Sequence, residues 1–292
     1  MFPIIPANSV TAASANSEGI FGYGTGYTAV TNLVSNAGVV SSDVAGVGTG
    51  RTQLAACEFG GDQGIMGFGT TGSVVSITNL VSNTGVVASD QAATTGTARR
   101  QLAACSFGSD KGIFGYGGGP TAVTNLVSNA GVVSSDVAGV GTARYELAAC
   151  EFGGDQGIFG FGFGPVSMTN LVSNAGVVSS DVAGVGTARG NLAACSFGED
   201  KGIFGFGDGY TSPTNLVSNT GVVASDQAAT TGTARNSIAA TQYDEDKGIF
   251  GFGHDGSGYV SITNLVSNAG VVASDTAGVG TGRGAPSACS FN

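Results

Sequence analysis

One internal repeat constrains the fold more than any other feature of the sequence. The motif Gly-Ile-(Phe/Met)-Gly-(Tyr/Phe)-Gly occurs six times, each copy being followed by Thr-Asn-Leu-Val-Ser-Asn and then by an arginine, at spacings of 45, 48, 45, 45 and 46 residues. Such a period indicates one supersecondary unit that buries its apolar surface against its neighbours. The copies begin at Gly19, Gly64, Gly112, Gly157, Gly202 and Gly248.

Each unit contains four short runs that are typical of β-strands. In the third unit they span 101–107, 112–116, 123–128 and 131–135, with turn residues between them. None is long enough to show the 3.6-residue apolar period of a helix. Asn129 and the small residues after it favour a tight hairpin between the last two runs. The unit is therefore predicted to be a four-stranded antiparallel meander.

Six such units predict an all-β chain, a six-bladed β-propeller with four antiparallel strands per blade over residues 19–292. Radial closure protects sheet edges, and it matches both the unit length and the strand count. The 52 glycines argue against helices, while the 41% hydrophobic content is too high for a disordered chain. Residues 283–291 match 99–107 without a gap. The C-terminal strand is thus expected to complete blade 1.

Charge and hydropathy exclude several partners. The net charge of −10 has the wrong sign for binding a nucleic-acid backbone. No apolar run approaches the roughly 18 residues of a transmembrane helix, so membrane insertion is not expected. Residues 1–18 lie outside the repeat, are apolar at Met1–Pro6 and lack the basic start of a secretory signal. We interpret them as an N-terminal extension that either lies on the ring or docks into a partner.

The cysteines share one repeat position, occupied by threonine in the remaining unit. Copies related by a near sixfold rotation should be too far apart for disulfides, so we expect reduced core residues. With no Cys-x-x-Cys pair and a single histidine, an axial metal site is the weaker alternative, and no metal or cofactor is predicted. The five are Cys57, Cys105, Cys150, Cys195 and Cys289.

An arginine opens the first strand of every unit. Six equivalent copies indicate a structural role, and we expect these side chains to pair with the aspartate eight or nine residues earlier or to cap backbone carbonyls between blades. A ring of arginines that binds an anion on the axis stays open as an alternative. The six are Arg51, Arg99, Arg144, Arg189, Arg235 and Arg283.

The units differ from each other mainly in two places, the loop between the second and third strands and the two residues after the arginine. In a meander blade both places lie on the same face. Exposed aromatic side chains on a rigid scaffold suit recognition of a glycan or a protein, with neutral variation as the alternative. The predicted ligand-binding residues are Tyr27, Tyr145, Phe163, Tyr210, Asp208, His254, Asp255 and Tyr259.

Enzymatic activity is not expected, and no catalytic residue is assigned. The chain has one histidine, and its loop carboxylates are isolated from one another. A hydrolase or lyase that cleaves glycans through Asp208 or Asp255 remains the alternative. Such an enzyme would depend on groups that the repeat does not duplicate.

The arginine in Gly-Thr-Ala-Arg, the glycine-ended second strand at 113–119 and ring closure by the C-terminal strand resemble kelch-type repeats across 19–292. The repeat lacks the later tryptophan of that family. The combination of Asp-Lys-Gly-Ile-Phe-Gly-Tyr-Gly, Thr-Asn-Leu-Val-Ser-Asn-Ala-Gly-Val-Val and Gly-Thr-Ala-Arg is also similar to repeat proteins of tailed, especially marine, bacteriophages that are labelled as tail-fibre or virion proteins.

The resemblance implies a non-enzymatic virion component, such as a fibre, tail or capsid-surface protein, assembled in the host cytoplasm. Its expected partners are other virion proteins, through residues 1–18, and a host surface glycan or protein, through the variable loops. A free-standing lectin-like module is the alternative within the same class. Binding as an isolated monomer would distinguish the lectin from a purely architectural subunit.

Overall fold

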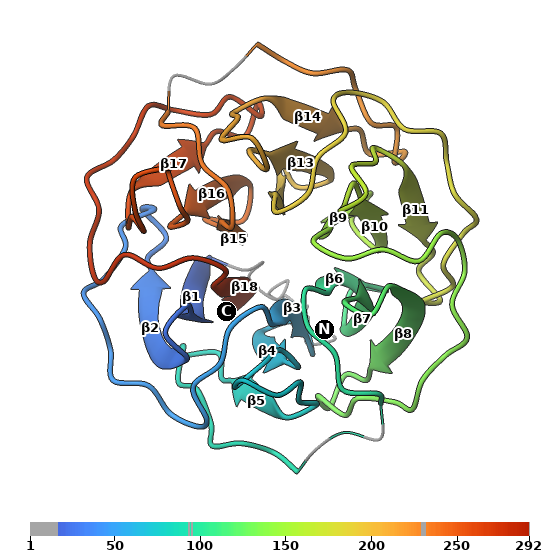
Figure 1. Cartoon of the computed structure of the whole chain (residues 1–292), viewed down its shortest axis with the longest axis horizontal. Coiled ribbons are helices and arrows are strands. Elements are labelled where there is room, and N and C mark those ends of the chain that lie inside the picture. The colour runs from blue at the N-terminus through green and yellow to red at the C-terminus, as the bar shows by residue number, and fades with distance from the viewer. Residues whose placement is uncertain (1–16, 93, 95, 229–231, 292) are drawn as a thin grey trace, which may run out of the picture.

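The computed structural model describes residues 17–92, 94, 96–228 and 232–291. Across these residues all regular structure is β, without a helix, as the sequence predicts. The strands form six three-stranded antiparallel sheets, which stand around a central axis in a propeller-like ring (Figure 1). We call each sheet a blade and number the blades in chain order from the one that contains β1. The predicted extension 1–18 lies almost wholly outside the described residues.

Each blade runs from an inner strand beside the axis to an outer strand at the rim (Figure 1). Blade 1 is composed of β18 (Ser287–Phe291), β1 (Glu18–Gly24) and β2 (Thr28–Val34); blade 2 of β3 (Ala55–Phe59), β4 (Gln63–Gly67) and β5 (Thr78–Val81); blade 3 of β6 (Ala103–Phe107), β7 (Lys111–Gly117) and β8 (Thr121–Val127); blade 4 of β9 (Ala148–Phe152), β10 (Gln156–Gly160) and β11 (Thr169–Val172); blade 5 of β12 (Ala193–Phe197), β13 (Lys201–Gly205) and β14 (Thr214–Val217); and blade 6 of β15 (Ala239–Tyr243), β16 (Lys247–Gly251) and β17 (Thr263–Val266).

The prediction of four strands per blade is wrong, because the fourth run forms no regular strand. In blade 3 it returns beside β8 but pairs only through isolated bridges at Val133 and Val137. Between these bridges side chains replace part of the backbone ladder. The Ser134 amide still donates to the Leu126 carbonyl at 2.8 Å, but the Leu126 amide donates to Ser134 Oγ at 2.9 Å, and Asn125 Nδ2 donates to the Ser134 carbonyl at 3.1 Å. Serine and asparagine compete with sheet pairing in this way. The outer edge is consequently held by a mixture of backbone and side-chain hydrogen bonds.

Glycines on the middle strands let neighbouring blades approach closely. A Cβ atom on Gly115 would lie 2.7 Å from Cζ of Phe159 in the next blade, and one on Gly112 would lie 2.5 Å from Sγ of Cys57. Phe159 also meets Tyr116 edge-on, with ring centroids 5.2 Å apart. The core is therefore divided into repeated layers between blades, which require glycine on one side.

The C-terminal strand pairs with β1, as predicted from the matching segments. β18 and β1 are antiparallel from Glu18 opposite Phe291 to Gly22 opposite Ser287. Blade 1 in turn packs on blade 6, where the Phe21 and Phe252 ring centroids are 5.1 Å apart. The two ends of the repeat region are joined by backbone hydrogen bonds, without a covalent link.

Two faces follow from this topology. The segments that join blades and the loops from the second to the third strand leave on one side, which we call the loop face. The turns from the first to the second strand leave on the opposite side, the turn face. The second-to-third loops of the loop face span 25–27, 68–77, 118–120, 161–168, 206–213 and 252–262.

Candidate binding face around the central axis

The six repeated arginines are buried between blades. Arg144 donates from Nε to the Phe161 carbonyl at 2.8 Å, from Nη1 to the Thr142 carbonyl at 3.2 Å and from Nη2 to Asn170 Oδ1 at 2.7 Å. Its Cζ lies 4.3 Å from the ring centroid of Tyr116 in the preceding blade. Each of the other five likewise stacks on an aromatic ring of the blade before it. The arginines thus connect the hydrogen bonds of one blade to the aromatic surface of the next.

Burial is the main electrostatic influence on these guanidinium groups. It lowers the pKa of Arg99, Arg189, Arg235 and Arg283 to about 10, and the charge of a nearby aspartate partly opposes the shift. None of the six lines the cavity on the axis. This placement does not favour the alternative of an axial anion site.

The carboxylate beside each arginine is not the one that precedes it in sequence, so the expected pairing is wrong. Arg144 Nη1 lies 4.0 Å from Asp181 Oδ1, at the end of its own blade. Asp136, eight residues before Arg144, belongs to the previous blade and accepts hydrogen bonds from Thr97. Burial would raise the pKa of Asp181, but hydrogen bonds from Thr142 and Asn170 lower it below its usual value. The aspartate therefore fastens the outer segment of a blade to the start of that blade.

The loop face brings three of the predicted ligand-binding side chains together. Tyr210, from blade 5, lies 5.8 Å from His254 of blade 6 between ring centroids. His254 meets Tyr259 edge-on at 5.1 Å, and its Nδ1 accepts a hydrogen bond from the Gly256 amide at 3.0 Å. Tyr210 and Tyr259 are 44% and 53% exposed. We call Tyr210, His254 and Tyr259 the aromatic cluster.

A second pair lies nearer the axis. The Tyr145 and Phe163 rings stack with centroids 4.8 Å apart and an interplanar angle of 25°. Asp208 turns towards the axis, where its Oδ1 accepts from Asn191 Nδ2 at 2.9 Å and its Oδ2 from the Gly190 amide at 3.2 Å. Hydrogen bonds thus connect a variable loop to the residues that follow a framework arginine.

Tyr27 and Asp255 stand apart from these groups. Tyr27 is 51% exposed and has no ring contact with any described residue. Asp255 Oδ1 accepts from Ser257 N and Oγ and from the Gly258 amide. These hydrogen bonds, the one from the Ser257 hydroxyl first, lower the pKa of Asp255 to about 2. Asp255 therefore closes its own loop, and its low pKa makes it a poor general acid.

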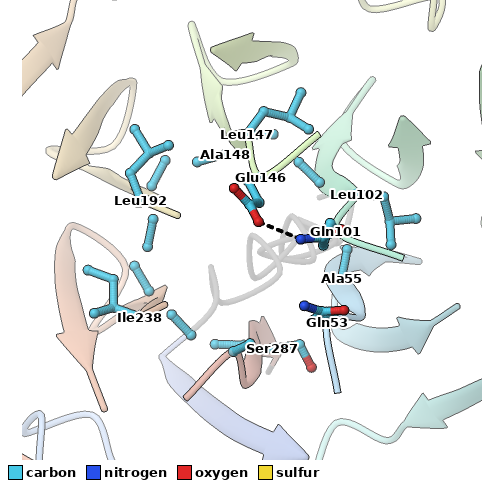
Figure 2. Close-up of a pocket in the computed structure, with 18 of the residues that line it drawn as sticks. Gln53, Ala55, Gln101, Leu102, Glu146, Leu147, Ala148, Leu192, Ile238 and Ser287 are labelled. Carbon is cyan, nitrogen blue, oxygen red and sulfur yellow. Dashed lines mark hydrogen bonds between the residues drawn. The ribbon is translucent and has the colours of Figure 1, made fainter. Parts of the chain in front are cut away.

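A closed circle of backbone hydrogen bonds surrounds the axis on the loop face. The second residue after each arginine donates its amide to the carbonyl of the equivalent residue in the preceding blade, at distances between 2.7 and 3.4 Å. All six have positive φ, from 45° to 58°. Figure 2 shows the opening that this circle frames. These residues, the mouth ring, are Gln53, Gln101, Glu146, Asn191, Ser237 and Ala285.

The mouth ring contains one carboxylate among neutral polar groups. Gln101 Nε2 donates to Glu146 Oε1 at 2.5 Å, and both side chains point into the opening (Figure 2). Burial and the negative charge of Asp208 raise the pKa of Glu146, against hydrogen bonds from Asn191 and Gln101 that lower it. The mouth can therefore offer hydrogen-bond donors as well as acceptors to a ligand.

Below the mouth ring the channel becomes apolar. The cavity on the loop face has a volume of about 140 Å³, with leucine and alanine walls. A smaller cavity of about 60 Å³ opens on the turn face, where Glu151 Oε2 accepts from the Ser106 hydroxyl at 2.7 Å. Burial raises the pKa of Glu151. The alanines common to both cavities are Ala104, Ala149, Ala194, Ala240 and Ala288.

The sequence prediction missed the mouth ring, apart from noting that its positions vary. A usable signal was present: five of the six side chains are polar, they differ between units, and they follow a framework arginine that fixes their place. The fact that they converge depends on the sixfold arrangement of blades. Tyr145, one residue before Glu146, was the single prediction from this segment.

The described part of the chain has neither clustered metal ligands nor a long apolar helix. No group of three or more His, Cys, Asp or Glu side chains there is arranged to hold a metal ion, and the five cysteines are free and buried. None of the described residues forms a helix of the length and apolarity needed to span a bilayer. Neither a scan against protein-family models nor a search of curated proteins found a match.

Proposed function

We propose that the protein is a non-enzymatic binding module whose loop face recognises carbohydrate. One observation carries the proposal: among the described residues, every exposed large aromatic side chain belongs to a second-to-third loop. These side chains are Tyr27, Phe163, Tyr210 and Tyr259. Aromatic rings present flat apolar surfaces on which the C–H faces of sugar rings stack, at little entropic cost.

The aromatic cluster is the strongest part of this surface. Tyr210 and Tyr259 flank His254, and the three side chains come from two blades whose relative position the arginine layer fixes through Arg235 and Phe206. A binding surface on a rigid scaffold loses little conformational entropy when a ligand binds, so more of the interaction energy contributes to affinity. The hydrogen bonds that occupy Asp255 support a binding role over a catalytic one for this loop.

The biological setting is proposed from the sequence resemblance alone. It is a virion-surface, tail or fibre component of a tailed bacteriophage, with kelch-like repeat units, assembled in the host cytoplasm. In that setting residues 1–18 would attach to another virion protein, and the loop face would contact a host glycan. A host protein as ligand, or a free-standing lectin, would use the same face.

The experiment is a glycan-array and host-cell binding assay of the full chain. Tyr210→Ala and Tyr259→Ala are compared with Tyr27→Ala, a loop-face tyrosine outside the aromatic cluster, after circular dichroism has shown that all variants fold. We expect the first two variants to lose at least tenfold in affinity and Tyr27→Ala to retain most of it. No glycan binding by the wild type, or unchanged binding by both Tyr210→Ala and Tyr259→Ala, would contradict the proposal.

A further inference from the structure

The cavity on the axis of the loop face is separate from the aromatic cluster and has an organisation of its own. Its polar mouth ring lies above buried Leu54, Leu102 and Leu147, and the floor consists of alanines such as Ala149. A volume of about 140 Å³ is close to the roughly 150 Å³ of an engineered protein cavity that binds benzene. One small chemical group can therefore enter the cavity, although a whole sugar chain cannot.

Side chains are kept at the mouth ring where glycine would be easier to accommodate. All six residues have a left-handed backbone conformation, which disfavours residues that carry a Cβ. The repeat uses glycine for many such conformations, as at Gly131 with φ 71°, and a buried aromatic residue for others, as at Tyr116 with φ 63°. None of the six mouth positions is glycine, and five carry a polar side chain.

Several hydrogen-bonding groups of the mouth ring have no partner among the described residues. The Gln53 side chain points into the opening and makes no hydrogen bond (Figure 2). Gln101 uses only Nε2, in its bond to Glu146, and its Oε1 accepts no hydrogen bond. The Ser237 hydroxyl also has no partner. These groups are neutral donors and acceptors, and no Lys or Arg side chain lines the cavity.

Neutral polar groups above an apolar floor are complementary to an amide that carries a methyl group. We propose that the mouth ring binds the acetamido group of an N-acetylated sugar residue, with its methyl on the alanine floor and its amide against Gln53 and Gln101. This inference rests on the proposed carbohydrate-binding function and names its substrate class. Tyr145, next to Glu146 and stacked on Phe163, provides an aromatic surface for the same ligand beside the mouth.

Isothermal titration of the full chain with three methyl glycosides tests the ligand. The probes are those of N-acetylglucosamine, glucose and glucosamine, which differ only at C2. We expect the N-acetylated sugar to bind at least tenfold more tightly than the other two. Equal binding of the glucose compound would overturn the inference, and tightest binding of the glucosamine compound would do so by showing that the site selects an ammonium group.

Variants of the mouth ring and of the alanine floor test whether the ligand binds in this cavity. Gln53→Ala combined with Gln101→Ala removes the unused amides, and Ala149→Leu fills the floor from a position that is partly exposed to the channel. Each should reduce binding of the N-acetylated sugar at least tenfold. Gln156→Ala, a glutamine at the turn-face end of β10, is the matched control and should leave binding unchanged.

The outcomes separate this inference from the proposed function. Glycan binding that requires Tyr210 but is unaffected by the mouth-ring variants would refute the axial site and leave the carbohydrate-binding face in place. Failure of the wild type to bind any glycan would refute both. If Ala149→Leu does not fold, the variant with Gln53→Ala and Gln101→Ala alone tests the axial site. Both glutamines lie at the open end of the cavity, where truncation does not disturb the core.

Discussion

Replacing Arg144 by methionine tests whether the arginine layer holds the blades together. Methionine keeps the length of the side chain but removes three hydrogen bonds and the contact of the guanidinium with the Tyr116 ring, 4.3 Å from Cζ. Hydrogen bonds to a charged group contribute about 1.5–3 kcal/mol each and a desolvated cation–π contact about 2 kcal/mol. The cost of burying the charge, which lowers the pKa of Arg144, offsets part of this sum.

Removing one partner of a buried ionic network costs about 3–5 kcal/mol, and we expect a loss of unfolding free energy in this range. The assay is urea unfolding at equilibrium, followed by circular dichroism and tyrosine fluorescence because the chain has no tryptophan. Arg100→Met is the control: Arg100 is exposed, so its loss should change stability by less than about 0.5 kcal/mol.

Arg99 provides an internal comparison. Neither Arg99 Nη2 nor Asn125 Oδ1 has a hydrogen-bond partner, so this arginine makes one hydrogen bond fewer than Arg144. Arg99→Met should therefore cost less than Arg144→Met, by about 1 kcal/mol. If Arg144→Met lowered stability no more than Arg100→Met does, the blades would not depend on the arginine layer and the reasoning would be refuted.

Three further predictions concern packing, pH and thiol reactivity. Gly115→Ala should destabilise the protein by about 1–3 kcal/mol through the clash with Phe159, whereas Gly258→Ala, which has open space, should not; thermal unfolding of both variants compares them. Because burial raises the pKa of Glu151 above its unfolded value, the folded state binds an extra proton, and the stability of the wild type relative to Glu151→Gln should fall as pH rises through the folded pKa. Denaturation curves between pH 4 and 7 measure this, and the opposite slope would contradict the assignment. The five cysteine thiols, buried and with raised pKa values, should react with a thiol reagent only in denaturant; rapid reaction of the native protein would show that the inner strands open.

The class of the fold and the number of blades follow from local patterns in the sequence. Turn residues, glycine–aromatic alternation and short apolar runs are local signals. Because each signal occurs in six copies, an ambiguous run in one unit can be interpreted from the equivalent runs in the others. The match of 283–291 to 99–107 also predicted the pairing of β18 with β1. These features follow from residues that are neighbours in sequence or copies of one another.

The pairing at the blade edges and the buried hydrogen-bond networks, by contrast, depend on how the blades fold and pack in three dimensions. The outer run pairs only through isolated bridges, and the Asn125 and Ser134 side chains take over part of the hydrogen bonds that a ladder would use. Arg144 faces Asp181, 37 residues further on, because an antiparallel blade folds its last segment back to its first. Sequence distance gives no measure of such contacts.

The candidate binding site likewise depends partly on local sequence and partly on the arrangement of the blades. Tyr210, His254 and Tyr259 were predicted one by one from their variable loops, but the rotation between blades 5 and 6 decides that their rings meet. The mouth ring shows the limit most clearly, since residues such as Gln53 and Gln101 are about one unit apart in sequence and adjacent on the axis. A binding surface composed of one residue from each blade exists only after the ring has formed.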